Sequence, residues 1–115
     1  MTDTIENEIV AKGLTFPRVT PTDIEAEIAT EHYFTAEDGV RNAEGSEGPA
    51  HNPLALLTFC VLVLRNGFTV TGESACASPE NFDADLGRKI ARQNAVAKMW
   101  PLLGYALRSR LAAEG

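Results

Sequence analysis

The sequence contains little of what metal enzymes, membrane proteins and phosphate-loop proteins require. Its 115 residues include two cysteines, Cys60 and Cys76, and two histidines, His32 and His51. The cysteines are not in C-x-x-C spacing, so we expect reduced thiols, no metal site and no cofactor. No apolar run approaches the roughly 20 residues that span a bilayer. No glycine-rich stretch has the spacing of a phosphate-binding loop.

Positive charge is also scarce, because ten Lys and Arg stand against sixteen Asp and Glu. Residues 1–53 hold eleven acidic and three basic side chains, a net charge of −8, whereas residues 54–115 carry +2. An acidic chain is repelled by phosphate at long range, so we expect no long nucleic acid as a partner. The first ten residues are acidic and polar, unlike a signal peptide. We therefore expect the chain to act in the cytoplasm, without a membrane partner.

The first half predicts short helices followed by a loop. Residues 3–12 are weakly helical and end at Gly13. Thr20 then precedes a proline and an acidic residue, which is typical of a helix start, and we expect this helix to run to about His32. Residues 36–53 contain three glycines and no apolar periodicity, so we predict a mobile loop there.

The centre of the chain predicts a β-hairpin. Two apolar, β-branched stretches, residues 55–64 and 68–76, flank Asn66-Gly67. Asn-Gly between such stretches favours a two-residue type I′ turn, because both of its positions need a positive φ. This turn pairs Val63 with Val70.

That register assigns the faces of the hairpin, because side chains alternate along a strand. It places Phe59, Val61 and Val63 in the core, and it places Ser74 opposite Phe59. Leu62 and Leu64 then lie on a second apolar side that also needs a cover. We expect the N-terminal helix or a second copy of the protein to supply it, and we favour a homo-oligomer.

The last third predicts two helices, at about residues 79–99 and 101–112. Ser78 or Asp83 can cap the first helix, and Pro101 should break or kink the run because it cannot donate a helical hydrogen bond. At 100° per residue, the apolar side chains that share an arc are Leu86, Ile90, Ala97 and Trp100. We expect this arc to face the core.

Two candidate nucleophiles, Ser74 and Cys76, lack the partners that catalysis requires. Gly72-Glu73-Ser74-Ala75-Cys76 resembles a serine-hydrolase elbow, but a cysteine replaces the second glycine and both histidines precede the serine. Cys76 also lacks a downstream histidine, so we interpret it as a packed thiol and expect no enzyme.

A basic arc on the first C-terminal helix is the main candidate site. Arg88, Lys89 and Arg92 lie in the first half of this helix, where the helix dipole gives cations no advantage. A solvated helix face remains the simpler alternative. In an oligomer such arcs could converge on a pocket and bind phosphate bidentately. The predicted ligand-binding set consists of Ser74, Asn81, Arg88, Lys89 and Arg92.

Residues 57–111 resemble the gene-product-forty-nine-like family of small tailed-phage and prophage accessory proteins. The resemblance rests on N-G-F-x-V-x-G-x-S-A-C from Asn66, N-F-D from Asn81, G-x-x-I-A from Gly87 and K-x-W-P-L-x-G-Y from Lys98. Residues 17–40 also look like longer members. Met99 and Leu103 depart mildly from the pattern. The resemblance implies no established activity or catalytic residue, so none is carried over.

Together these patterns predict a single α+β domain, assembled as a homo-oligomer, that acts by binding in the cytoplasm of an infected bacterium. We expect a non-enzymatic accessory protein that sequesters a small anionic nucleotide signal of host anti-phage defence, because long-range repulsion is tolerable for a small ligand. The alternative is a protein–protein adaptor that inhibits a host enzyme through the acidic N-terminal half.

Overall fold

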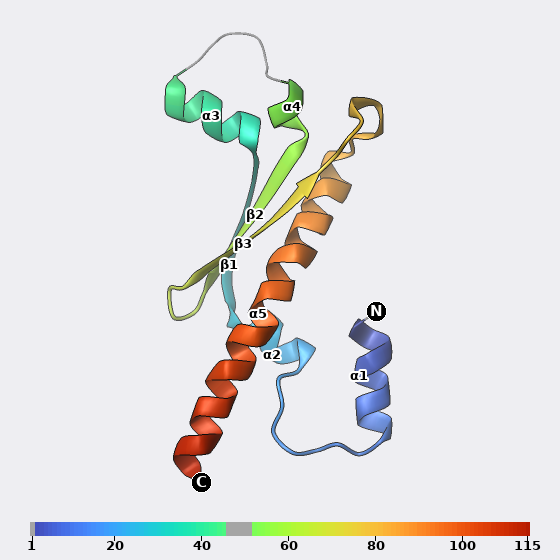
Figure 1. Cartoon of the computed structure of the whole chain (residues 1–115), viewed down its shortest axis with the longest axis vertical. Coiled ribbons are helices and arrows are strands. Elements are labelled where there is room, and N and C mark those ends of the chain that lie inside the picture. The colour runs from blue at the N-terminus through green and yellow to red at the C-terminus, as the bar shows by residue number, and fades with distance from the viewer. Residues whose placement is uncertain (1, 46–51) are drawn as a thin grey trace.

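A computed structural model describes residues 2–45 and 52–115, which form a three-stranded antiparallel sheet with helices before, between and after the strands (Figure 1). This arrangement confirms the predicted α+β class. In chain order the elements are α1 (Thr2–Ala11), α2 (Pro21–Glu27), β1 (Ile28–Thr35), α3 (Ala36–Glu44), α4 (Asn52–Ala55), β2 (Leu57–Leu64), β3 (Thr69–Ala75), the 3-10 turn η1 (Pro79–Asn81) and α5 (Ala84–Glu114).

The helix expected up to His32 is too long, because the chain changes from helix to strand at Ile28. Helix α2 begins as predicted, with Thr20 and Asp23 in a reciprocal capping box. It ends at Glu27, and β1 then pairs antiparallel with β2. Residues 28–35 alternate between the two sheet faces and end in aromatic and β-branched side chains, which suit a strand. The hydrogen bonds with β2 therefore make residues 28–35 a strand, although their local sequence pattern favours a helix.

The predicted loop at 36–53 is wrong for residues 36–44, which form α3. Thr35 caps this helix, since its hydroxyl accepts from the Asp38 amide while Asp38 accepts from the Thr35 amide. Gly45 ends the helix in a left-handed conformation. Residues 52–55 form the single turn α4, and residues 46–51 lie outside the described residues.

The hairpin is confirmed, but its register differs by one residue from the prediction. Leu64 and Phe68 close a three-residue loop, so Leu62, not Val63, pairs with Val70. Asn66 keeps a negative φ and accepts a hydrogen bond from the Phe68 amide through its side chain, whereas Gly67 adopts a φ of 89°. A single positive φ is what a three-residue loop with a bulge requires.

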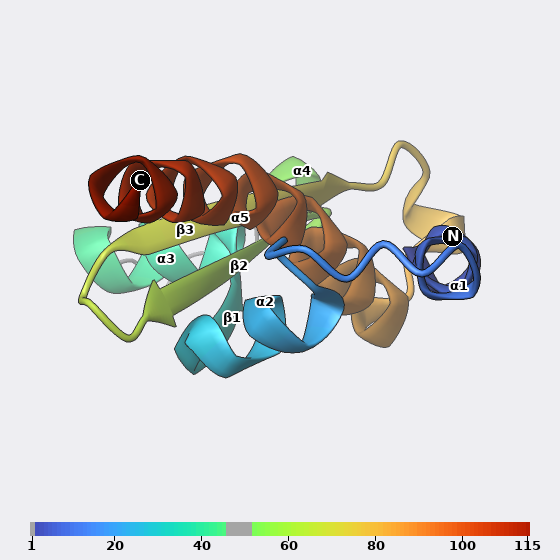
Figure 2. The same ribbon diagram turned by 90° about the horizontal axis from the view of Figure 1, so that it is seen from below.

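The one-residue shift exchanges the two faces of the sheet. Thr58, Cys60, Leu62 and Leu64 are buried beneath α5, and Ser74 lies opposite Thr58 instead of Phe59. The side of the hairpin that was expected to need a second copy is therefore covered by this chain's own C-terminal helix. Figures 1 and 2 show α5 running along one face of the sheet.

The two predicted C-terminal helices are one continuous helix, α5, which begins after the Asp83 cap and passes through Pro101. Pro101 and Ala97 are both exposed, so water can solvate the Ala97 carbonyl that loses its helical partner. The predicted apolar arc is also wrong, since Leu86 and Ile90 are exposed. Residues with small or flexible side chains face the sheet instead, namely Ala91, Ala95 and Met99.

The molecule is elongated, because α5 extends beyond the sheet and α1 stands apart from it (Figures 1 and 2). Its principal extents are 59 × 29 × 17 Å, and its radius of gyration is 18.1 Å. A compact domain of this length has a radius of gyration of about 13 Å. Within the described parts of the chain, no helix combines the length and apolarity that crossing a bilayer demands.

Candidate functional site

Arg92 of the predicted basic arc is engaged within the fold. Its guanidinium donates to both carboxylate oxygens of Glu25, at 3.2 and 2.8 Å, and its Nε donates to Glu31 at 3.2 Å. These bonds join α5 to α2 and β1. The pKa of Arg92 is raised, and the hydrogen bonds to Glu25 are the main cause. Two carboxylates therefore neutralise this cation before any ligand arrives.

Glu31 also connects Arg92 to a tyrosine and a buried thiol. The Tyr33 hydroxyl donates to Glu31 at 2.6 Å, and this bond, followed by the one from Arg92, lowers the pKa of Glu31. Burial is the main cause that raises the pKa of Tyr33 and of Cys60. Cys60 is fully buried, and a thiol with a raised pKa is a poor nucleophile.

Arg88 and Lys89 share one carboxylate, Asp85, one helical turn before them. Lys89 Nζ lies 3.2 Å from Asp85, whereas the Arg88 guanidinium lies 3.8 Å from it. The side chain of Lys89 is 71% exposed and that of Arg88 is 46% exposed. The three cations of the arc therefore differ: Arg92 is held by two carboxylates, Lys89 is solvated, and Arg88 is only loosely paired.

Arg88 lines a small hollow of about 110 Å³, which we call the Arg88 hollow. It lies where the end of β1, the start of β2 and the start of α5 meet. Arg88 lines this hollow together with Phe34, Phe82, Thr35 and Thr58, and the ring of Phe34 stacks on Phe59. The full lining is Tyr33, Phe34, Thr35, Asp38, Thr58, Phe82, Ala84 and Arg88.

Sequence reasoning missed the aromatic and hydroxyl members of the Arg88 hollow. Phe34 and Thr35 lie at the end of a strand that was not predicted, and Thr58 faces α5 only in the observed register. The capping box from Thr35 to Asp38 was the available signal, because a helix that begins there fixes the chain direction at Phe34.

Ser74 and Asn81 lie in a different hollow from the basic residues. This space of about 280 Å³, the Cys76 hollow, is lined mainly by apolar residues from β3, from the turn that follows it and from α5, together with Leu56. The Cys76 thiol donates to the Ser78 carbonyl at 3.2 Å. Phe82 borders both hollows. The structure therefore does not bring Ser74 and Asn81 together with Arg88, Lys89 and Arg92.

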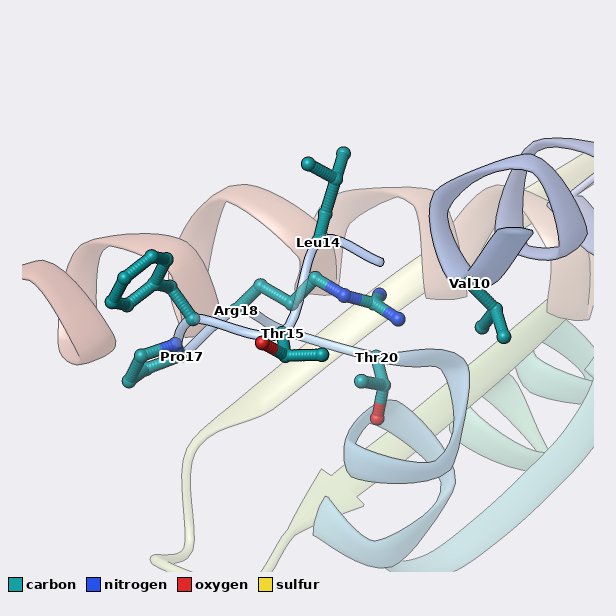
Figure 3. Close-up of a pocket in the computed structure, with 7 residues that line it drawn as sticks. Val10, Leu14, Thr15, Pro17, Arg18 and Thr20 are labelled. Carbon is teal, nitrogen blue, oxygen red and sulfur yellow. The ribbon is translucent and has the colours of Figure 1, made fainter. Parts of the chain in front are cut away.

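A third hollow, of about 370 Å³, lies between α1 and the linker that follows it (Figure 3). Figure 3 shows the Arg18 guanidinium extending toward α1, on the side of Val10. This cation binds both carboxylate oxygens of Glu6 at 2.8 Å. Because Arg18 is fully engaged, the hollow offers an apolar lining and no available charge.

Among the residues that the structure describes, no group of three His, Cys, Asp or Glu side chains is placed to hold a metal. His32 is exposed on β1 and bonds to Thr30 at 3.1 Å. Both thiols are free, in agreement with the expected reduced state.

Comparison with known proteins finds no match among curated proteins and none among solved structures. A family model does match, over residues 19–111, which is most of the chain and includes β1 to β3, η1 and nearly all of α5. This match confirms the kind of phage family that the motifs between Asn66 and Tyr105 resemble. The chain therefore belongs to the phage protein (N4 Gp49/phage Sf6 gene 66) family.

Proposed function

We propose that this phage protein binds a small nucleotide and sequesters it in the cytoplasm of the infected host, without converting it. The observation that carries the proposal is the Arg88 hollow, which this loosely paired arginine lines together with Phe82, Thr35 and Thr58. Guanidinium groups bind phosphate bidentately, and phenyl rings stack with bases. A nucleotide signal of host anti-phage defence is a ligand of this chemistry.

Within the basic arc, Arg88 is the residue that supports nucleotide binding best. Arg92 already binds Glu25 and Glu31, so a phosphate would have to displace two carboxylates. Arg88 lies 3.8 Å from its nearest acid, so a phosphate oxygen can replace a weak contact. The net charge of −6 disfavours long polyanions more than a small ligand held at one point.

The size of the hollow limits how much of the ligand one chain can hold. Sites for small molecules usually measure about 300–1,000 Å³, whereas the Arg88 hollow measures about 110 Å³. One chain therefore offers room for a phosphate and one ring edge. The rest of a nucleotide would lie outside the hollow or against a second copy.

Titration calorimetry of the full chain with mononucleotides, cyclic dinucleotides and ADP-ribose tests this function. We expect one class to bind, and Arg88→Gln to weaken its binding 10-fold or more, since a hydrogen bond to a charged group contributes about 1.5–3 kcal/mol. Lys89→Gln removes the same charge from the next position, outside the hollow, and should change the affinity less than twofold. Absence of binding across the panel, or equal losses in the two variants, would refute the site.

Sequestration also predicts that the ligand is recovered intact. After overnight incubation with the protein and heat denaturation, chromatography should return the bound nucleotide unchanged. A new product that forms in proportion to protein concentration would contradict a purely binding role.

The second candidate is an adaptor that binds a host protein through its N-terminal arm, residues 2–17. Its supporting observation is the exposure of apolar side chains there, with Phe16 at 89% and Val10 at 64%. The arm holds three acids and one base, a net charge of −2, within an N-terminal half of −8, which suits a partner with a basic, apolar groove. In a pull-down from host lysate, the wild-type chain should retain one host protein. The Phe16→Ser variant should lose that protein, and the Phe68→Ser variant should keep it. Equal capture by both variants would exclude the arm.

A further inference from the structure

Within the described residues, the face of the sheet opposite α5, which we call the open face, has no cover along most of its length. The observed register assigns its residues, which are Thr30, His32 and Phe34 of β1, Leu57, Phe59, Val61 and Val63 of β2, and Thr69, Thr71, Glu73 and Ala75 of β3. Helix α3 reaches only the Phe34 end, where Gly39 approaches the phenyl ring. The element that makes the most extensive contact with β2 and β3 is α5, which lies on the other face.

The centre of the open face is apolar throughout. Every outward side chain of β2, from Leu57 to Val63, is hydrophobic and only half-buried by its neighbours. Phe59 extends the patch toward β1 by stacking on Phe34, with ring centroids 5.5 Å apart. An antiparallel sheet that faces water normally alternates apolar and polar side chains, so a central strand that is apolar on both faces indicates a cover on both.

The exposed area of the chain agrees with a missing cover. The accessible surface is 7916 Å², whereas a compact monomer of 12.4 kDa exposes about 6,100 Å². The excess of about 1,800 Å² is more than the roughly 800 Å² that each partner buries in a standard interface. The N-terminal arm and the end of α5 that extends beyond the sheet contribute to this excess together with the open face.

The charge pattern favours a second copy as the cover. The open face carries one acid, Glu73, which lies at its edge 3.8 Å from Lys98. Three of its seven flanking positions on β1 and β3 are threonines, Thr30, Thr69 and Thr71, whose hydroxyls can both donate and accept hydrogen bonds. Such a face meets its own copy without opposing like charges, whereas it offers a highly charged partner no complement.

We propose that two copies of this chain pack their open faces together, forming a sandwich of two sheets with an α5 helix on each outer side. Sheets stacked in this way lie about 10 Å apart, with the central β2 side chains interdigitating. The interface is isologous, because each chain contributes the same surface. This dimer needs no ligand, so it stands independently of nucleotide binding.

The mass of the full chain in solution tests the interface. Sedimentation velocity at about 50 µM is expected to give a dimer for the wild type and a monomer for Thr71→Glu, because that variant places two carboxylates in an apolar contact. Thr71 is exposed in one chain, so the change leaves the fold of the protomer intact. Thr22→Glu adds the same charge on exposed α2 and should remain dimeric.

Val61→Lys provides a second variant, at the centre of the open face. Unchanged far-ultraviolet circular dichroism together with a monomeric mass in both variants would support the dimer, as would a larger assembly whose mass falls in both. A wild-type chain that is monomeric, or a mass that Thr71→Glu leaves unchanged, would overturn the proposal.

Discussion

Gly72 allows the closest approach between the sheet and α5. A Cβ at this position would overlap the carbonyl oxygen of Ala91 and the amide nitrogen of Ala95, both in the helix backbone. Side chains can rotate away from such an overlap, but a helix backbone can relieve it only by moving as a unit. The small residues that face the sheet, Ala91 and Ala95, are fully buried because the two backbones lie so close.

Gly72→Ala should lower the free energy of unfolding by at least about 3 kcal/mol, the upper range for overpacking a core. Gly104→Ala is the matched control, since a Cβ there meets nothing within 4 Å. In a helix interior that change should stabilise the protein by about 0.5–1 kcal/mol. Urea denaturation measures both, and similar stabilities for the two variants would mean that α5 does not lie against Gly72.

Glu31 stabilises the fold through its ionised form. Its pKa is lowered first by the hydrogen bond from Tyr33 and then by Arg92, so the folded state favours the carboxylate. A group whose pKa is lower in the folded state stabilises the protein above its unfolded pKa. That stabilisation is lost as the pH falls through the lowered, folded value.

Glu31→Gln should therefore reduce stability at pH 7, by about 1 kcal/mol once the contribution is discounted for the 39% exposure of this side chain. The difference from the wild type should shrink below about pH 4.3, the usual Glu pKa, and vanish at lower pH. Thermal unfolding between pH 2.5 and 7 measures it, with Glu44→Gln at the end of α3 as the control. A difference that is constant with pH would rule out the ionised carboxylate as its source.

At the scale of elements, local signals located the helix caps and the hairpin but not the strand pairing. Thr20 and Asp83 cap helices as their sequence context predicts, because capping involves residues only three positions apart. The hairpin register depends on whether Asn66 adopts a positive φ, which its neighbours alone do not decide. Strand β1 gains its hydrogen bonds from β2, more than twenty residues away, so a window of local sequence could not reveal it.

At the candidate site, too, the spacing of nearby residues predicts one part, and contacts between residues far apart in the chain determine the other. The basic arc was predictable, because positions four apart lie on one side of a helix. Its pairing was not, because Glu25 and Glu31 reach Arg92 from elements more than sixty residues earlier. Ser74 and Asn81 belong to the predicted ligand-binding set, whereas the structure places them at the Cys76 hollow, beside the turn between β3 and α5.

Pro101 lies inside the continuous helix α5, and replacing it tests whether this helix is straight there. Proline inside a helix removes one hydrogen bond and is about 3 kcal/mol less favourable than alanine. Pro101→Ala restores a donor for the Ala97 carbonyl, and both positions are exposed, so we expect the free energy of unfolding to rise by about 1–3 kcal/mol. Urea denaturation with circular dichroism at 222 nm measures the change. Destabilisation would show instead that the fold requires a bend at Pro101.

At the scale of the whole molecule, the N-terminal arm is attached to the body but adds little to its core. The family match begins at residue 19, after the arm and its linker. Helix α1 packs extensively against none of the other described helices or strands. The ion pair between Glu6 and Arg18 ties it to the chain just before α2. The buried core starts only at Ile24.

Limited trypsin digestion should therefore cut first after Lys12, which is exposed at the end of α1, and leave residues 13–115 folded. Removing residues 1–12 breaks the partly exposed ion pair between Glu6 and Arg18, which contributes about 0–1 kcal/mol to the free energy of unfolding. Its urea midpoint should thus lie close to that of the full chain. Arg65 serves as the internal control, because cleavage there would open the hairpin. First cleavage after Arg65, or a large fall in stability on losing the arm, would mean that the arm belongs to the core.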